Sequence, residues 1–334
     1  MPLEKKKPII YNPKLPSELV NPNTKVVNEL GTLIDKGERK LNVGGQAMTS
    51  VKVLYMPTAD DLDGVIQNKI SLGGFTEFDR AVMSAVASLY LAGNEIVTPS
   101  TIYRLISGVP ESHFIAENQV NQVKESMQKL GFLYVVIDFT EELRRKNPEA
   151  DIEEAKIEDR AVAKKGITIR AGGHIVDAYQ IHSIPILYTY ANAIDQVLRI
   201  PLSYLSVGGR DTAERIALKH YLLRRILSKT TKMSNDVLYT TLYSVMGITE
   251  PSKADQRTLK RIRSYIHACL QAWSEMGILK GYQVNMERRS YHSITLYKQT
   301  NQAELPPEIT SLPPEPPAPY SSDLLDYINE VFSE

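Results

Sequence analysis

The sequence predicts an α+β protein that is mainly helical and contains two similar units in tandem. The first observation is a repeated order of segments, in which a long helix, a short helix and a third helix precede strands. The second is a near-constant offset: Thr76 and Asp211 begin the two first helices 135 residues apart, and Ile102 corresponds to Leu238 at an offset of 136. The third is the length of 334 residues, 43% of them hydrophobic, which suffices for two domains with cores of ordinary size.

Capping residues mark the helices of the first unit. Thr76 precedes Asp79 by three residues, which is typical of a helix N-cap, and the next helix has Pro99 in its first turn and ends at Gly108. We expect helices over 75–94, 98–108 and 116–131, followed by a strand over 132–139.

The second unit repeats this order. We expect helices over 211–228, 233–248 and 255–278, then two strands joined by a charged turn within 281–298. Three helices closed by a β-hairpin are typical of a winged helix-turn-helix domain. The predicted fold is therefore α+β, mainly helical, with tandem winged helix-turn-helix domains that carry small β-hairpin wings. A helical domain that carries a hairpin for another reason would show the same pattern, so that alternative stays open.

Composition divides the chain into five segments. We expect a flexible basic arm, a first winged-helix domain with a charged insertion at 140–165, a second winged-helix domain, a Pro-rich linker and an acidic amphipathic tail. Their bounds are 1–35, 36–200, 201–300, 301–319 and 320–334.

The predicted helix over 255–278 has a basic first half and an apolar second half. At about 100° per residue, Arg257, Lys260, Arg261 and Ser264 fall on one side, with Thr258 near them. The opposite side carries Ile262, Ile266, Cys269, Leu270 and Trp273. Cations near a helix N-terminus oppose the helix dipole, so their presence favours an external polyanion such as DNA, where Arg and Lys bind guanine O6 and N7. A solvated basic face is the alternative interpretation.

The charge distribution supports this interpretation. The chain has no net charge, yet residues 210–298 contain 16 Lys and Arg against 7 Asp and Glu. Arg288 and Arg289 occupy the turn of the predicted wing, where they would hold phosphates. In the first unit, Asn118 and Gln122 face outward and are able to pair with adenine, but their helix is nearly neutral. We therefore expect the first unit to be a dimerisation module or a secondary DNA contact.

The order of elements over roughly residues 40–298 resembles the two-winged-helix replication initiator (Rep) proteins of theta-replicating plasmids. The segment TEFDRAVMSAVASLYLAGNEIVTPSTIYRLISG (76–108) also resembles the start of initiator-like proteins of related mobile elements. The resemblance implies that the second domain carries most base contacts, through Arg257, Lys260, Arg261 and Ser264, with Arg288 and Arg289 as wing contacts. It implies that the first domain mediates dimerisation and phosphate contacts. The insertion at 140–165 and the long C-terminal tail depart from the family pattern.

No catalytic or metal-binding motif occurs in the sequence. There is no GxxxxGK[ST] motif, and the six histidines never form HxH, HxxxH or HExxH. A nicking enzyme that uses a His pair one residue apart is therefore disfavoured. We expect no catalytic residues, no metal and no cofactor. The single cysteine, the lack of an apolar run of roughly 18–20 residues and the lack of a signal peptide favour a cytoplasmic protein without membrane contact.

The last residues have a different composition. Residues 301–334 contain seven acidic residues and no Lys or Arg. Helical spacing of apolar residues within 320–334 predicts an amphipathic helix that binds a partner such as a host replication protein, through Leu324, Leu325, Ile328 and Phe332. A disordered solubilising tail is the alternative. The leading hypothesis is a sequence-specific duplex DNA-binding initiator; a winged-helix transcriptional regulator and a protein-interaction scaffold are the rivals.

Overall fold

The computed structural model of this chain describes residues 13–44, 47–56, 74–110, 112–171, 174–209, 211–228, 234–288 and 290–298. All of the described residues belong to one compact unit. The predicted linker and the tail residues Leu324, Leu325, Ile328 and Phe332 lie outside the described residues. Of the helices in the described ranges, none is long and apolar enough to cross a membrane.

The first repeat begins with the central helix α3 (Glu77–Leu91), whose residues from Phe78 to Leu89 are all buried. The predicted N-cap is confirmed, and it forms a full capping box: Asp79 N donates to Thr76 Oγ1 at 3.2 Å and Thr76 N donates to Asp79 Oδ2 at 2.8 Å. β4 (Ile96–Val97), α4 (Pro99–Ser107) and α5 (Glu117–Phe132) follow. β4 pairs with the second strand of the hairpin β7 (Lys164–Ala171) and β8 (His174–Ile181), which gives the order β4-β8-β7.

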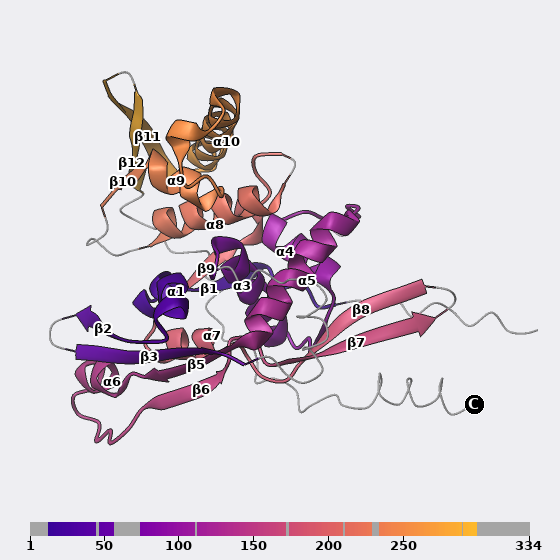
Figure 1. The fold of residues 1–334 in the computed structure, drawn as a ribbon, viewed down its shortest axis with the longest axis vertical. Coiled ribbons are helices and arrows are strands. Elements are labelled where there is room, and N and C mark those ends of the chain that lie inside the picture. The colour runs from indigo at the N-terminus through magenta and orange to yellow at the C-terminus, as the bar shows by residue number, and fades with distance from the viewer. Residues whose placement is uncertain are drawn as a thin grey trace, which may run out of the picture. The chain divides into compact units, whose positions relative to one another are not determined.

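The second repeat has the same order of elements, except that in the first repeat residues 133–160 stand between the third helix and the hairpin (Figure 1). α8 (Ala213–Leu227), β10 (Asp236–Leu238), α9 (Tyr239–Val245) and α10 (Gln256–Glu275) precede the hairpin β11 (Leu279–Glu287) and β12 (Ser290–Lys298). Here β10 pairs with β12, so the sheet order is β10-β12-β11. The predicted helix over 233–248 therefore begins later, because its first residues form a strand. Short 3-10 turns occur at Leu202–Tyr204 and Pro251–Lys253. The α+β class is thus present, with small antiparallel sheets.

The prediction of a flexible arm over 1–35 is wrong from residue 18 onward. Residues Glu18–Pro22 form β1, and Lys25–Lys36 form α1, which is capped by the Thr24 side chain. Apolar residues at helical spacing bury this helix in the core: Val26, Val27, Leu30 and Leu33. β1 pairs with β9 (Val197–Pro201), in the connection between the two repeats.

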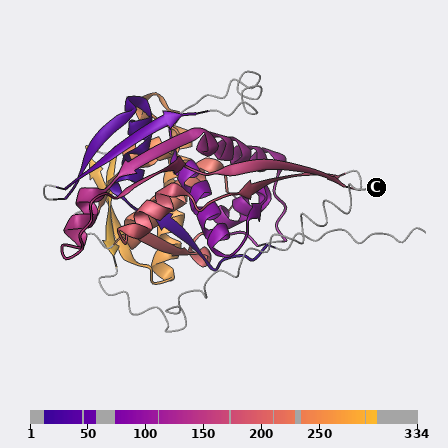
Figure 2. The ribbon, with the colours of Figure 1, turned by 90° about the horizontal axis from the view of Figure 1, so that it is seen from below.

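The charged segment 140–165, predicted as an insertion, contains a short helix and strands that join the sheets of the protein. It forms α6 (Thr140–Lys146), β6 (Lys156–Arg160) and the start of β7. β6 completes an antiparallel sheet with β2 (Glu38–Gly44), β3 (Ala47–Tyr55) and β5 (Leu133–Asp138), in the order β2-β3-β5-β6. Figure 2 shows these strands side by side in indigo and magenta. Glu142 of α6 is buried and accepts from Thr49 and from Tyr190 of α7 (Ile186–Ala193), which ties the segment to the core.

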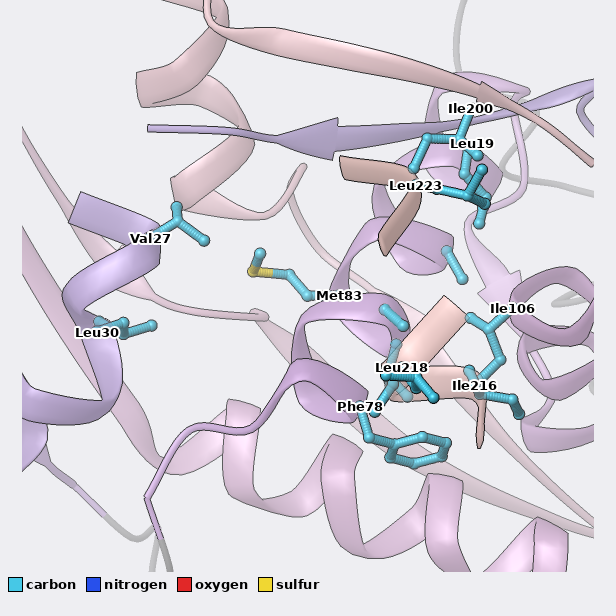
Figure 3. Close-up of a cluster of buried hydrophobic side chains, with 14 of the residues drawn as sticks. Leu19, Val27, Leu30, Phe78, Met83, Ile106, Ile200, Ile216, Leu218 and Leu223 are labelled. Atoms are coloured by element: carbon cyan, nitrogen blue, oxygen red, sulfur yellow. The ribbon is translucent and has the colours of Figure 1, made fainter. Parts of the chain in front are cut away.

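One hydrophobic core extends through both repeats, because α3 packs directly against α8. Figure 3 shows Leu19, Met83 and Ile106 in the same buried cluster as Ile216, Leu218 and Leu223. The two predicted domains therefore share their interior within one compact unit.

A buried polar centre lies inside this contact. Arg80 of α3 and Arg224 of α8 both donate to Asn28 Oδ1, at 2.7 and 2.9 Å, and Arg224 also pairs with Glu77. Burial and the neighbouring Arg224 lower the pKa of Arg80 to about 9. Hydrogen bonds to protein groups thus replace much of the hydration that the two guanidinium groups lose on folding.

His220 of α8 makes the free energy of unfolding of the protein depend on pH. Its ring is buried, with Nε2 2.9 Å from Ile106 O of α4, and burial lowers its pKa to about 4. Between the ordinary pKa near 6.5 and pH 4 the unfolded chain binds a proton that the folded chain excludes. The free energy of unfolding therefore falls as the pH falls through this window.

We expect the His220 contribution to decrease by about 3 kcal/mol between pH 6.5 and 4. The measurement is urea unfolding of the natural chain and of His220→Gln, which keeps a donor for Ile106 O but does not titrate. The difference in unfolding free energy between the two proteins should shrink toward acid pH. A difference that does not change with pH contradicts this assignment.

Candidate nucleic-acid interface

The N-terminal half of α10 presents the predicted basic residues to solvent. Asp255 caps the helix by accepting from Arg257 N and Thr258 N, both at 3.2 Å. Arg257, Lys260, Arg261 and Ser264 are exposed and Thr258 is half-buried. The opposite face is buried through Leu259, Ile262, Ile266, Cys269, Leu270 and Trp273. The predicted division into two faces is confirmed, while the DNA-contacting role of these residues stays a prediction.

The exposed basic residues line one hollow of about 410 Å³ on the flank of α10. Its lining residues are Gly208, Arg215, Arg257, Lys260, Arg261, Ser264, Tyr265 and Ala268. A second hollow of about 500 Å³ adjoins it and shares Arg215, Arg261 and Tyr265. The two hollows therefore form one continuous surface between α10 and the start of α8, and we call it the α10 basic surface after its arginines and lysine.

Arg215 of α8 belongs to this surface, although no local pattern in the sequence marks it as a binding residue. Its guanidinium lies 4.6 Å from the centre of the Tyr265 ring, so an aromatic side chain of α10 fixes it. Arg215 lies 42 positions before Arg257 in the chain. Only the packing of α8 against α10 brings the two together.

The α10 basic surface is short of compensating acids. In the part of the chain that the structure describes, Arg257, Lys260 and Arg261 make no ion pair. Glu214 borders the second hollow and Asp255 is engaged in the cap. A group of cations that the protein leaves unneutralised suits a polyanionic ligand.

The hairpin β11–β12 lies against another flank of α10. Arg263 places its guanidinium 4.3 Å from the ring centre of Tyr291 in β12 and donates to Tyr243 OH of α9 at 2.9 Å. The Glu287–Ser290 pair closes the hairpin, and Arg288 in its turn is exposed with a φ of 45°. Arginine rarely adopts this left-handed conformation, which favours Gly and Asn. Arg289 lies outside the described residues.

A buried ion pair fixes α10 to the rest of the unit. Lys219 of α8 donates to Asp211 Oδ2 at 2.9 Å, and Tyr265 OH of α10 donates to Asp211 Oδ1 at 3.4 Å. Tyr103 of α4 donates to the backbone oxygen of Asp211 at 3.3 Å. Burial raises the pKa of Asp211, and the adjacent Lys219 opposes that rise. Both repeats therefore meet at Asp211.

The first repeat has no comparable basic surface on α5. Asn118 is exposed and Gln122 is half-buried, and neither lines the hollows at α10. The lysines of α5 are paired: Lys129 with Asp79 at 2.7 Å, and Lys124 with Asp177 of β8. A role of Asn118 and Gln122 in DNA binding stays a prediction.

Candidate metal ligands do not gather in the part of the chain that the structure describes. Within those ranges, no three His, Cys, Asp or Glu residues are grouped so that they could hold a metal ion. Cys269 is a free, buried thiol on the apolar face of α10.

No protein-family profile matches this chain, and no curated protein does. Two solved structures of domains 2 and 3 of RctB are similar to it in fold. One is 13% identical with a TM-score of 0.34 and covers 84% of this chain and 100% of its own. The other is 11% identical with a TM-score of 0.35 and covers 77% of this chain and 88% of its own. At these values the likeness is coarse and does not define a function for this chain.

Gly208 fixes the distance between the loop before α8 and the base of the α10 basic surface. Its φ is 86°, and an added Cβ would lie 2.8 Å from Tyr265 Cε2 and 2.9 Å from Cys269 Sγ. We expect Gly208→Ala to lower the free energy of unfolding by about 2–4 kcal/mol, because backbone strain and overpacking add. Gly209→Ala is the matched control, since Gly209 has a φ of 79° and nothing within 4 Å of its added Cβ. Chemical denaturation that finds equal losses in the two variants would contradict the packing argument.

Proposed function

We propose that α10 and the β11–β12 hairpin form a winged helix that binds double-stranded DNA, with α10 in the major groove. The observation that carries this proposal is the α10 basic surface, where three exposed cations without ion pairs gather beside Arg215. The order of three helices followed by a hairpin, with the hairpin against α10, supports it.

The positions on α10 suit contacts with neighbouring base pairs. Arg257 and Arg261 are one helical turn apart, about 6 Å along the axis, which approaches the rise of two base pairs. In this arrangement Arg257, Lys260 and Arg261 contact guanine edges, and Thr258 and Ser264 contact bases or phosphates. Arg288 and Arg289 contact the DNA backbone, and Asn118 and Gln122 are secondary contacts. The proposal assigns a catalytic role to none of the residues.

The biological role that we propose is initiation of replication of a plasmid or mobile element, through binding of repeated sites and recruitment of host proteins. Its support is the resemblance in the order of elements to two-winged-helix Rep proteins. A transcriptional regulator would use the same surface. Selection of bound fragments from genomic DNA, followed by sequencing, tests the role: iterated repeats beside the gene of this protein favour the initiator, whereas scattered promoter sites favour the regulator. The homodimer through the first repeat and the partner of residues 320–334 stay predictions.

We expect Arg257→Ala and Arg261→Ala each to weaken binding to the selected site by about 1–3 kcal/mol and to relax its base preference. Fluorescence anisotropy at one fixed salt concentration measures the change. Lys52→Ala, which removes an exposed cation of β3, is the matched control and should bind as the natural chain does. Unchanged affinity in both α10 variants would remove α10 from the interface.

We expect Arg288→Ala to weaken binding to every duplex by a similar factor, because a phosphate contact carries no sequence information. The slope of log affinity against log salt should become shallower by about one unit. Titrations of the selected site and of a scrambled duplex over a range of salt concentrations measure this slope. A loss confined to the selected site would instead indicate a base contact at the hairpin turn.

A further inference from the structure

Arg263 differs from the other cations of α10 because its side chain contacts the hairpin and α9. It is half-buried, lies 4.3 Å from the Tyr291 ring centre and donates to Tyr243 OH at 2.9 Å. On the helix it is displaced by roughly 120° from Arg257. It does not line either hollow of the α10 basic surface.

A chain of rings extends this contact over both strands of the hairpin. Tyr291 meets Tyr239 of α9 edge-on, with ring centres 5.3 Å apart. Tyr239 OH lies 3.2 Å from His267 Nε2 of α10, and the His267 ring lies 5.6 Å from that of Tyr282 in β11. The hairpin is therefore attached to α9 and α10 by aromatic and cation–aromatic contacts.

The attachment at Arg263 lies close to the hairpin turn. Tyr291 pairs with Met286, and the next pair, Glu287 and Ser290, is the last before Arg288. A guanidinium has the flat, forked shape needed to stack on Tyr291 while it donates to Tyr243, and an ammonium does not. The Arg263 contact therefore holds the hairpin close to its turn.

We propose that Arg263 is a positioning residue, which holds the β11–β12 hairpin at a fixed angle to α10 so that Arg288 reaches the DNA backbone while α10 occupies the groove. That Arg288 reaches the DNA backbone rests on the proposed DNA-binding function. That Arg263 sets the angle of the hairpin concerns the free protein and is tested without DNA.

The free protein is tested by measuring the distance between two spin labels. The labels are attached to the cysteines introduced by Glu287→Cys and Gln271→Cys, and both positions are exposed. The native Cys269 is buried, and burial raises its pKa to about 11, so it reacts slowly with the label. We expect a narrow distance distribution with Arg263 present and a broader one in Arg263→Lys and in Tyr291→Leu. Tyr291→Phe, which keeps the ring, should stay narrow. Equal widths in all of these variants overturn the positioning role.

The test with DNA is a double-mutant cycle between Arg263 and Arg288. We expect Arg263→Lys, which keeps the charge, to make the salt slope shallower by about one unit, as Arg288→Ala does. The combined variant should show little further change, because a misdirected hairpin has already lost its contact. Additive changes overturn the proposal in favour of independent DNA contacts, and so does an Arg263→Lys protein that binds as the natural chain does.

The two experiments distinguish the proposals from each other. Absence of duplex binding by the natural chain overturns the proposed function, and the label distances still decide whether Arg263 directs the hairpin. Thermal melting of each variant shows whether it is folded. Tyr291→Leu provides the same test from the other side of the contact if Arg263→Lys does not fold.

Discussion

Lys219 has no exposed surface, and the arrangement of both repeats depends on how its charge is balanced. Its ammonium donates to Asp211 and to backbone oxygens of Ser107, Leu205 and Val207. These partners come from the end of α4 and from the loop that leads into α8. Because an unpaired buried charge is strongly unfavourable, α4, this loop and α8 must come together in one arrangement. Tyr265 extends the constraint to α10, so the direction of the candidate DNA surface is set from inside the protein.

The pairing of buried charges also explains how a chain without net charge presents a cationic surface. Cations in the interior have partners: Arg80 and Arg224 share Asn28, and Lys219 pairs with Asp211. On α5 the lysines are paired as well, whereas on α10 the exposed cations have no ion-pair partner among the described residues. The two repeats thus have a similar order of elements but different surface electrostatics. The order of elements is common to both apart from residues 133–160, and only the second repeat concentrates charge where an external polyanion would bind.

The sequence predicted the features that depend on local periodicity and capping. The faces of α10, the caps of α3 and α4 and the hairpin over 281–298 all follow from neighbouring residues. It missed β1 and α1, because their Pro- and Asn-containing surroundings masked the spacing of Val26, Leu30 and Leu33. It also missed β6, because the segment KIEDR is mostly charged and lacks the apolar alternation that marks a strand. Arg215 and the Arg263–Tyr291 contact were missed for another reason: each depends on tertiary proximity, which no local pattern of one sequence encodes. The spacing within α1 was a signal that sequence analysis could have used.

The pairing of β1 with β9 has a consequence for how the chain is made. Leu19 lies opposite Ile200, so one of the earliest described strands has its partner about 180 residues further along the chain. At typical rates of synthesis the ribosome needs roughly 10–40 s to produce that length, during which the buried side of β1 has no sheet neighbour. β1, which packs against α3 of the first repeat, therefore gains its sheet partner only after β9 has been made. A pairing this far apart in sequence favours late closure and gives molecular chaperones a period in which to hold the nascent chain.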